Sequence, residues 1–181
     1  PNRLNEVYGL EAKNPGIILE DADLDFSVNE CLTGALKFNG QRCTALKILF
    51  VHSSLINKFL DKLSEKMNDI RFGMPWEKDI LITPLPEKGK VDYLSNLLKD
   101  AQSHGASVIN KNGGGINETF FYPAALYPVN DKMMIYHEEQ FGPIVPIISY
   151  DSIEEPLQYI QASNYGQQVS IFGENPDTIA R

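Results

Sequence analysis

Residues 16–51 read GIILEDADLDFSVNECLTGALKFNGQRCTALKILFV and decide the fold class. The apolar run over 16–20 predicts a short buried strand, and residues 46–51 predict a second one. Between them, Asp23 is placed to cap a helix over 24–39, whose apolar residues recur at three- and four-residue steps. A strand, a helix and a second strand in this order predict a βαβ unit with parallel strands.

The rest of the chain continues this alternation of strands and helices. A helix capped by Ser53 is expected to run to about Met67, and a helix over 88–103 is expected to end at Gly105. The other expected elements are strands over 106–109, 120–126, 144–150 and 169–172, helices over 156–162 and from Pro176, a loop over 72–86 and a glycine turn over 112–115. This pattern predicts one α/β domain, with a largely parallel sheet flanked by helices. Because the last helix has no strand after it, we expect the natural polypeptide to continue beyond a C-terminal truncation.

Composition excludes several classes of partner. The chain has 181 residues, with 16 Lys and Arg against 24 Asp and Glu, and its net charge is −8. This balance argues against nucleic acid and against an anionic membrane surface, since both attract basic proteins. No apolar run approaches the roughly 18 residues of a membrane-spanning helix. Two cysteines cannot form a disulfide framework and the three histidines are scattered, so we expect a cytoplasmic protein with reduced thiols and no metal site.

The sharpest local signal is the stretch FNGQRCTA over residues 38–45, between a predicted helix and a predicted strand. Gly40 would let the backbone approach a substrate closely, and the Arg42 cation would favour a reactive thiolate at Cys43. The alternative is that Cys43 is a small buried apolar residue. Cys31 lies among apolar residues of the predicted helix, so we expect it to be buried and inert.

The stretch GQRCTA over residues 40–45 resembles the nucleophile segment of the NAD(P)-dependent aldehyde dehydrogenases. Further stretches resemble the same family in the same order, and together they span nearly the whole chain. They are KNP at 13–15 with IILEDADL at 17–24, EEQFGP at 138–143, NYG at 164–166 and SIF at 170–172. The resemblance implies that residues 1–181 form the cysteine-bearing catalytic domain and that Cys43 is the nucleophile.

The resemblance also implies a mechanism. The Cys43 thiolate would attack the aldehyde, and the backbone N–H of Cys43 would help to stabilise the oxyanion. Hydride would pass to NAD or NADP, and water would hydrolyse the resulting thioester to the acid. Glu139 would hold hydroxyls of the nicotinamide ribose and Phe141 would pack against the nicotinamide. Without the resemblance, these two residues would be interpreted as a solvated charge and a core aromatic.

One motif departs from the family. The family's general base is a glutamate in a Glu-Leu-Gly-Gly-Lys segment whose lysine matches Lys13, and that glutamate falls on Gly9 here. Glu11 is the remaining carboxylate of this segment and is the candidate base, although two residues of extended chain move a side chain by roughly 6–7 Å. Two alternatives therefore stay open: acyl transfer to a thiol such as coenzyme A, and an inactive interaction domain that keeps the fold.

The cofactor and the substrate are less completely specified. No Gly-x-Gly-x-x-Gly motif follows a predicted strand, so we expect the dinucleotide-binding domain to be absent from this chain. The isolated chain is then expected to fold without oxidising aldehydes. The cysteine stretch is most similar to the non-phosphorylating glyceraldehyde-3-phosphate dehydrogenase branch, which implies a small aldehyde, with a phosphorylated one as a candidate. The longer parent protein is expected to be a homo-oligomer.

Overall fold

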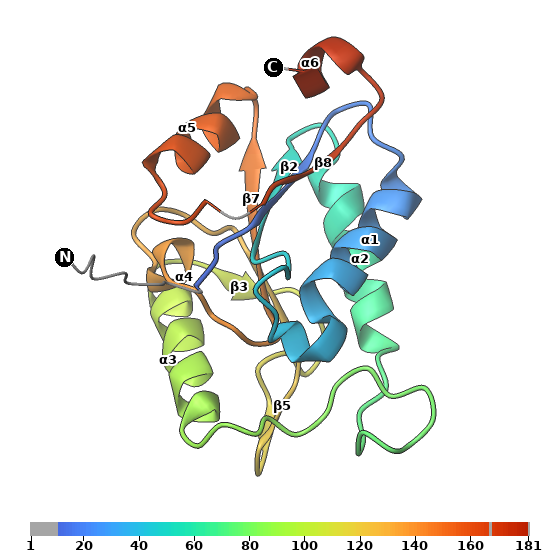
Figure 1. Cartoon of the computed structure of the whole chain (residues 1–181), viewed down its shortest axis with the longest axis vertical. Coiled ribbons are helices and arrows are strands. Elements are labelled where there is room, and N and C mark those ends of the chain that lie inside the picture. Colours follow the sequence, from blue (N-terminus) through green and yellow to red (C-terminus); the bar gives the residue numbers. More distant parts are fainter. Residues whose placement is uncertain (1–10, 167, 181) are drawn as a thin grey trace, which may run out of the picture.

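A six-stranded sheet runs through the centre of the molecule (Figure 1). The computed structural model describes residues 11–166 and 168–180. The strand order is β3-β6-β7-β2-β1-β8, and every neighbouring pair is parallel except β3 with β6. The strands are β1 (Pro15–Ile18), β2 (Ile48–His52), β3 (Ser107–Val108), β6 (Ala124–Tyr127), β7 (Ile144–Tyr150) and β8 (Ser170–Phe172). The predicted α/β class and the largely parallel sheet are confirmed.

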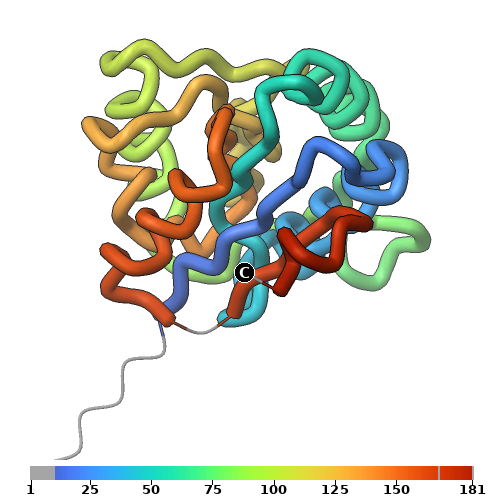
Figure 2. The backbone as a smooth tube through the Cα atoms, turned by 90° about the horizontal axis from the view of Figure 1, so that it is seen from above, coloured from blue at the N-terminus to red at the C-terminus, as the bar shows by residue number. Residues whose placement is uncertain are grey.

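Helices cover both faces of the sheet (Figures 1 and 2). Apolar residues of alternate strand positions point to opposite faces, so Ile18 and Leu49 pack with one helical layer and Ile17 and Phe50 with the other. On the first face lie α1 (Leu24–Leu36) and α2 (Ile56–Asn68); on the second lie α3 (Lys90–Ser103), α4 (Met134–His137) and α5 (Glu154–Ala162). A short α6 (Pro176–Ala180) follows β8. The predicted βαβ unit is β1-α1-β2, and Asp23 caps α1 by accepting a hydrogen bond from the Phe26 N–H.

The predicted elements differ from the observed ones in three places. α1 ends at Leu36 rather than near residue 39, because the chain turns into a short 3₁₀ segment, η1 (Lys37–Gly40), with left-handed backbone. Ser53 does not cap α2, which begins after Leu55 without a side-chain cap. The strand expected over 120–126 is interrupted at Pro123, since proline cannot donate to a strand ladder. Before the proline, β5 (Phe120–Phe121) pairs with β4 (Ile116–Asn117) in a small hairpin, and β6 follows the proline.

The parallel strands bring several loops to one edge of the sheet. The amino ends of β1, β2, β7 and β8 share this edge, because these strands are parallel neighbours. The segments that precede them are residues 13–14, 41–47, 138–143 and 168–169. The KNP, GQRCTA, EEQFGP and SIF motifs therefore lie in, or directly after, loops at this amino edge, whereas residues 19–24 follow the carboxyl end of β1. Open α/β sheets more commonly bind ligands at the opposite, carboxyl edge.

Candidate active site

The two cysteines lie in contrasting surroundings. Cys31 is fully buried in α1, and this burial raises the pKa of its thiol. Cys43 is exposed in the turn that precedes β2. A thiol that solvent and small molecules reach can react, whereas one enclosed by apolar side chains cannot. The predicted burial of Cys31 is confirmed, and the interpretation of Cys43 as a buried apolar residue is wrong.

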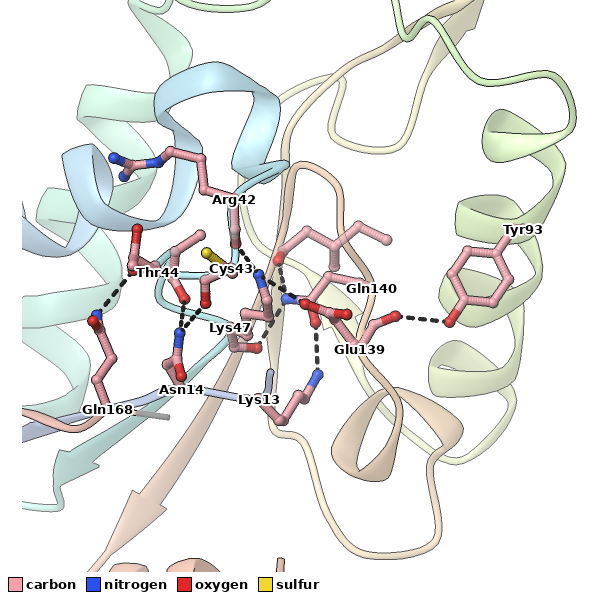
Figure 3. Close-up of polar contacts among 12 residues, drawn as sticks. Lys13, Asn14, Arg42, Cys43, Thr44, Lys47, Tyr93, Glu139, Gln140 and Gln168 are labelled. Atoms are coloured by element: carbon pink, nitrogen blue, oxygen red, sulfur yellow. Dashed lines mark hydrogen bonds and ion pairs between the residues drawn. The ribbon is translucent and has the colours of Figure 1, made fainter. Parts of the chain in front are cut away.

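Residues 42–45, here called the cysteine segment, form a turn that side chains hold from outside (Figure 3). Asn14, which is buried just before β1, donates from Nδ2 to the carbonyl oxygens of Cys43 at 2.6 Å and Ala45 at 3.0 Å. A buried carbonyl without a partner is destabilising by about 1–3 kcal/mol. One amide side chain therefore fixes the backbone on both sides of Thr44.

Two further side chains complete this arrangement. Lys47 donates from Nζ to the Arg42 carbonyl oxygen at 2.6 Å, and Gln168 donates from Nε2 to the Thr44 carbonyl oxygen at 2.9 Å. Each carbonyl of the cysteine segment thus accepts a hydrogen bond from a side chain that belongs to another part of the site. This restraint fixes the position of the Cys43 backbone although its side chain stays exposed.

A left-handed turn over residues 38–40 precedes the cysteine segment. Phe38, Asn39 and Gly40 all have positive φ, at 56°, 59° and 68°. A Cβ on Gly40 would lie 2.7 Å from the Ala35 and Gly142 carbonyl oxygens, so only glycine fits between these backbones. This close approach joins the end of α1 directly to the loop that carries Glu139 and Phe141.

Lys47 is the buried cation of the site, and its side chain is only 1% exposed. Its Nζ lies 3.2 Å from Glu139 Oε1 and 5.2 Å from the centre of the Phe141 ring. Burial lowers the pKa of the Lys47 ammonium, while the Glu139 carboxylate opposes that shift by favouring the charged form. The structure therefore brings the cysteine segment, Glu139 and Phe141 together around one lysine.

A second buried lysine supports the site from the side of β1. Lys13 donates to Gln140 Oε1 at 2.7 Å, and Gln140 in turn donates to the carbonyl oxygens of Lys47 and Ile144. Burial, followed by the charge of Lys47, lowers the pKa of Lys13 well below its usual range. Gln140 therefore ties β1, β2 and β7 together at their amino ends (Figure 3).

Glu139 and Phe141 occupy the outer part of the site. Tyr93 on α3 donates its hydroxyl to the Glu139 carbonyl oxygen at 2.9 Å and lies 3.3 Å from Glu138 Oε2. Phe141 is half-buried, and the Lys90 ammonium lies 5.6 Å from its ring centre. A half-exposed aromatic face beside a carboxylate has the chemistry to bind a flat heterocycle that carries hydroxyl groups.

The Arg42 cation does not lie beside the thiol. Its guanidinium lies 5.5 Å from the centre of the Phe38 ring and points away from the Cys43 sulfur (Figure 3). The expectation that Arg42 assists the thiolate directly is therefore wrong for this conformation. The cation that reaches the cysteine segment is Lys47, which the sequence analysis did not select.

Glu11 is exposed at the beginning of the described chain. Burial raises the pKa of Tyr165, and the carboxylates of Glu11 and Glu139 raise it further. Glu11 and Glu139 thus both act electrostatically on the Tyr165 hydroxyl, while Cys43, Glu139 and Phe141 gather around Lys47. Gly9, where the family's general base falls, lies outside the described residues.

Sequence analysis missed the residues that hold the site, namely Asn14, Lys47, Tyr93, Gln140 and Gln168. One signal pointed to Lys47, because it interrupts the apolar run over 46–51 that forms a buried strand. A lysine in such a run either ends the strand or is buried with a partner.

Among the described residues, none of the helices has the length and apolar character of a membrane span. The same residues contain no group of three or more His, Cys, Asp or Glu side chains that could hold a metal ion.

Comparison with known proteins identifies this arrangement. Residues 6–181 match the Aldehyde dehydrogenase family, and the chain belongs to that family. It is 38% identical over 169 residues to the NADP-dependent glyceraldehyde-3-phosphate dehydrogenase of Streptococcus equinus, covering 92% of this chain and 34% of that protein. It is 34% identical over 175 residues to the alpha-ketoglutaric semialdehyde dehydrogenase of Bacillus subtilis (strain 168), covering 93% and 36%.

Solved structures agree with this assignment. The aldehyde dehydrogenase from Brucella melitensis biovar abortus 2308 superposes with a TM-score of 0.90 at 27% identity, covering 94% of this chain and 35% of that one. The NADP-dependent glyceraldehyde-3-phosphate dehydrogenase from Bacillus halodurans C-125, complexed with NADP, gives 0.87 at 33% identity, covering 92% and 34%. The chain therefore spans about a third of the length of the relatives that it matches.

Proposed function

We propose that this chain is the cysteine-bearing catalytic part of an enzyme that oxidises a small aldehyde to the corresponding acid, with NAD or NADP as hydride acceptor. The observation that carries the proposal is the exposed Cys43 thiol on a backbone whose surrounding carbonyls are all held by side chains. Such restraint suits a nucleophile that must meet its substrate in one geometry. Cys31, enclosed in α1, has no such role.

The proposed chemistry has two stages on Cys43. The thiolate sulfur bonds to the aldehyde carbon, and the carbonyl oxygen becomes an oxyanion that accepts a hydrogen bond from the Cys43 N–H. The oxyanion then re-forms a carbonyl as hydride leaves the carbon, which gives a thioester. Water adds to that thioester, the C–S bond breaks, and the acid and the free thiol are released.

The outer part of the site is proposed to hold the nicotinamide end of the cofactor. The half-buried Phe141 ring and the Glu139 carboxylate fit a nicotinamide and its ribose hydroxyls, and Lys47 and Tyr93 fix both residues in place. The cofactor would supply the acceptor for the hydride. The relatives named as NADP-dependent support NADP, and they also support a phosphorylated aldehyde such as glyceraldehyde-3-phosphate.

Glu11 is the proposed general base for thioester hydrolysis, because it is the carboxylate of the family-like segment that ends at Lys13. Its exposure leaves it free to reach water. Glu11→Gln should slow the release of acetate from acetylated Cys43 by about tenfold to a hundredfold, without changing the rate of acetylation. An unchanged release rate would favour the second candidate, transfer of the acyl group to a thiol, which the glycine at position 9, where the family has its glutamate, also supports.

The isolated chain is proposed to lack dehydrogenase activity. Glu139 and Phe141 would contact only the nicotinamide end, and the relatives are about three times as long as this chain. The contacts to adenosine and pyrophosphate, which supply much of the binding free energy of a dinucleotide, would come from another domain. Calorimetric titration with NAD and NADP, with an absorbance assay for reduced cofactor, tests this; micromolar binding with turnover would contradict it.

The assignment of the nucleophile is tested by iodoacetamide labelling followed by peptide mass spectrometry. Cys43 should be alkylated at least about a hundredfold faster than Cys31 in the folded chain, and the two should label equally in denaturant. Cys31→Ser is the matched control, and it should keep the full labelling rate at Cys43. Faster labelling at Cys31 than at Cys43 would reject the proposed function.

A further inference from the structure

Lys47 lies against the peptide unit on which the proposed chemistry depends. Its Nζ donates to the carbonyl oxygen of Arg42 at 2.6 Å. The Arg42 carbonyl and the Cys43 N–H belong to the same peptide unit, which is planar and trans, so the two groups point in opposite directions. Fixing the carbonyl oxygen therefore fixes the direction of the Cys43 N–H.

We propose that Lys47 is a positioning residue that orients and polarises the Arg42–Cys43 peptide, so that the Cys43 N–H becomes a stronger and better-aimed donor to the oxyanion. The inference rests on the proposed function, in which Cys43 is acylated. A hydrogen bond from a charged donor draws electron density toward the carbonyl oxygen, and the N–H of that peptide becomes more positive. The effect is strong here because water does not reach Nζ to compete.

The contacts of Lys47 suit an ammonium rather than a neutral donor. Its Nζ donates to the Arg42 carbonyl oxygen, lies 3.2 Å from the Glu139 carboxylate and lies over the face of the Phe141 ring. The ionisable groups that act on it are Glu139, Cys43 and Arg42, together with Lys13, which lies just before β1. The Glu139 carboxylate favours the charged form of this buried ammonium.

The turn itself does not depend on Lys47 alone. The Ala45 N–H also donates to the Arg42 carbonyl oxygen, at 3.2 Å, and Asn14 holds the next carbonyl. A variant without the ammonium is therefore expected to keep the turn while losing the charge-assisted polarisation. This separation makes the proposal testable by chemistry rather than by folding alone.

Two reagents distinguish the roles, because only one of them passes through an oxyanion. With p-nitrophenyl acetate, the Cys43 sulfur bonds to the ester carbon, the carbonyl oxygen becomes an oxyanion, and collapse breaks the C–O bond to release p-nitrophenolate and leave an acetyl thioester. With iodoacetamide, the sulfur bonds to the methylene carbon and iodide leaves, without any oxyanion. The ratio of the two rate constants therefore reports on oxyanion stabilisation and not on exposure of the thiol.

The experiment measures this ratio in the 181-residue chain and three variants. Lys47→Met, similar in length but uncharged, should lower the ratio by about tenfold, and Lys47→Arg should restore most of it. Lys62→Met is the control for the substitution itself, because Lys62 on α2 pairs with Asp25 of α1 at 2.6 Å rather than with any residue of the cysteine segment. Its ratio should stay within about twofold of the wild-type ratio.

Each outcome decides a separate point. If Cys43 of the wild-type chain reacts no faster with either reagent than a free cysteine does, the proposed function fails. If Cys43 is acylated rapidly but the ratio is unchanged in Lys47→Met, or if both rates fall together, the role of Lys47 is overturned and that of Cys43 stands. Should circular dichroism find Lys47→Met unfolded, Lys47→Gln, which keeps a neutral donor, replaces it, and an unchanged ratio there also overturns the role.

Discussion

The two edges of the sheet are built by different means. At the amino edge, Lys13, Asn14, Lys47 and Gln140 are all buried, and each binds a backbone or side-chain group far away in the sequence. At the carboxyl edge, exposed carboxylates cap nearby backbone, as Glu155 does by accepting from the N–H groups of residues 151 and 152.

This difference indicates that the loops at the amino edge are held more rigidly than those at the carboxyl edge. Burying a polar side chain is unfavourable unless each of its groups is hydrogen-bonded, so a concentration of such residues marks a region whose geometry is under strong constraint. The carboxyl edge also has a hollow, lined in part by His52, Asp21 and Asp151, yet exposed caps hold its loops. We expect substitutions at the amino edge to be more destabilising than similar ones at the carboxyl edge.

The strongest test of this contrast compares two asparagines. Asn14→Ala would leave the buried carbonyl of Ala45 and the partly buried carbonyl of Cys43 without their side-chain donor, and we expect a loss of about 4 kcal/mol in the free energy of unfolding. Asn175→Ala at the carboxyl edge removes an exposed cap of α6 and should lower it by less than about 1 kcal/mol. Urea unfolding measures both, and equal losses would remove the distinction between the edges.

Two glycines provide the next test. Gly40→Ala places a Cβ 2.7 Å from two backbone carbonyl oxygens and should destabilise the chain by about 3 kcal/mol. Gly89→Ala is the matched control, since Gly89 also has positive φ, at 80°, but a Cβ there meets no atom within 4 Å. We expect about 1 kcal/mol at Gly89 from the backbone conformation alone. A smaller loss at Gly40 than at Gly89 would show that the close approach to Gly142 is not essential.

Alkaline pH gives the smallest effect. Burial, and then the Glu138 carboxylate, raise the pKa of Tyr93 to about 12. Unfolded tyrosine titrates near about 10, so the stability that Tyr93 contributes is fully present below pH 10 and is lost as the pH rises toward 12. Between pH 9 and pH 11, Tyr93→Phe should therefore lose about 1 kcal/mol less stability than the wild type does. The difference is small because the half-exposed hydroxyl is partly screened by solvent.

Tyr150, whose hydroxyl donates to the Ile18 carbonyl oxygen at the carboxyl edge, is the comparison for Tyr93. Its pKa is also raised by burial, and Tyr150→Phe should flatten the alkaline loss in the same direction. Glu138→Gln should reduce the effect of Tyr93→Phe without altering that of Tyr150→Phe. Parallel losses in wild type and Tyr93→Phe would contradict the assignment of the alkaline loss to this hydroxyl.

Sequence patterns were sufficient for the sheet and its helices. Strong apolar runs such as those in β2 and β7 and the cap at Asp23 each act locally, so a short window contains the necessary information. The end of α1 was misplaced because three consecutive left-handed residues stop the helix, although the apolar pattern continues past Leu36. Gly40 approaches Gly142 closely at this turn, and that contact depends on the tertiary fold.

The candidate site was only partly predictable. The motif residues Cys43, Glu139 and Phe141 are identified by family resemblance and brought together by the fold, while their catalytic and cofactor-binding roles stay predictions, as does the role of Glu11. The role of Lys47 in the site could not be assigned from the sequence, because that role depends on contacts with residues up to 94 positions away. Hydrophobic patterns describe which residues are buried, and they do not describe how a buried charge is satisfied.

The position of β1 between β2 and β8 also orders the events of folding. The first strand of the described chain pairs with the last, and two of the bonds around the site join Lys13 to Gln140 and Thr44 to Gln168, 127 and 124 residues apart in sequence. Contacts of such separation form late, after local helices and strand pairs have shortened the loops to be closed. During synthesis, α1 and its buried Cys31 would be made long before residue 168 emerges. We therefore expect the Cys43 backbone to become fully restrained only when nearly all of this chain has been translated.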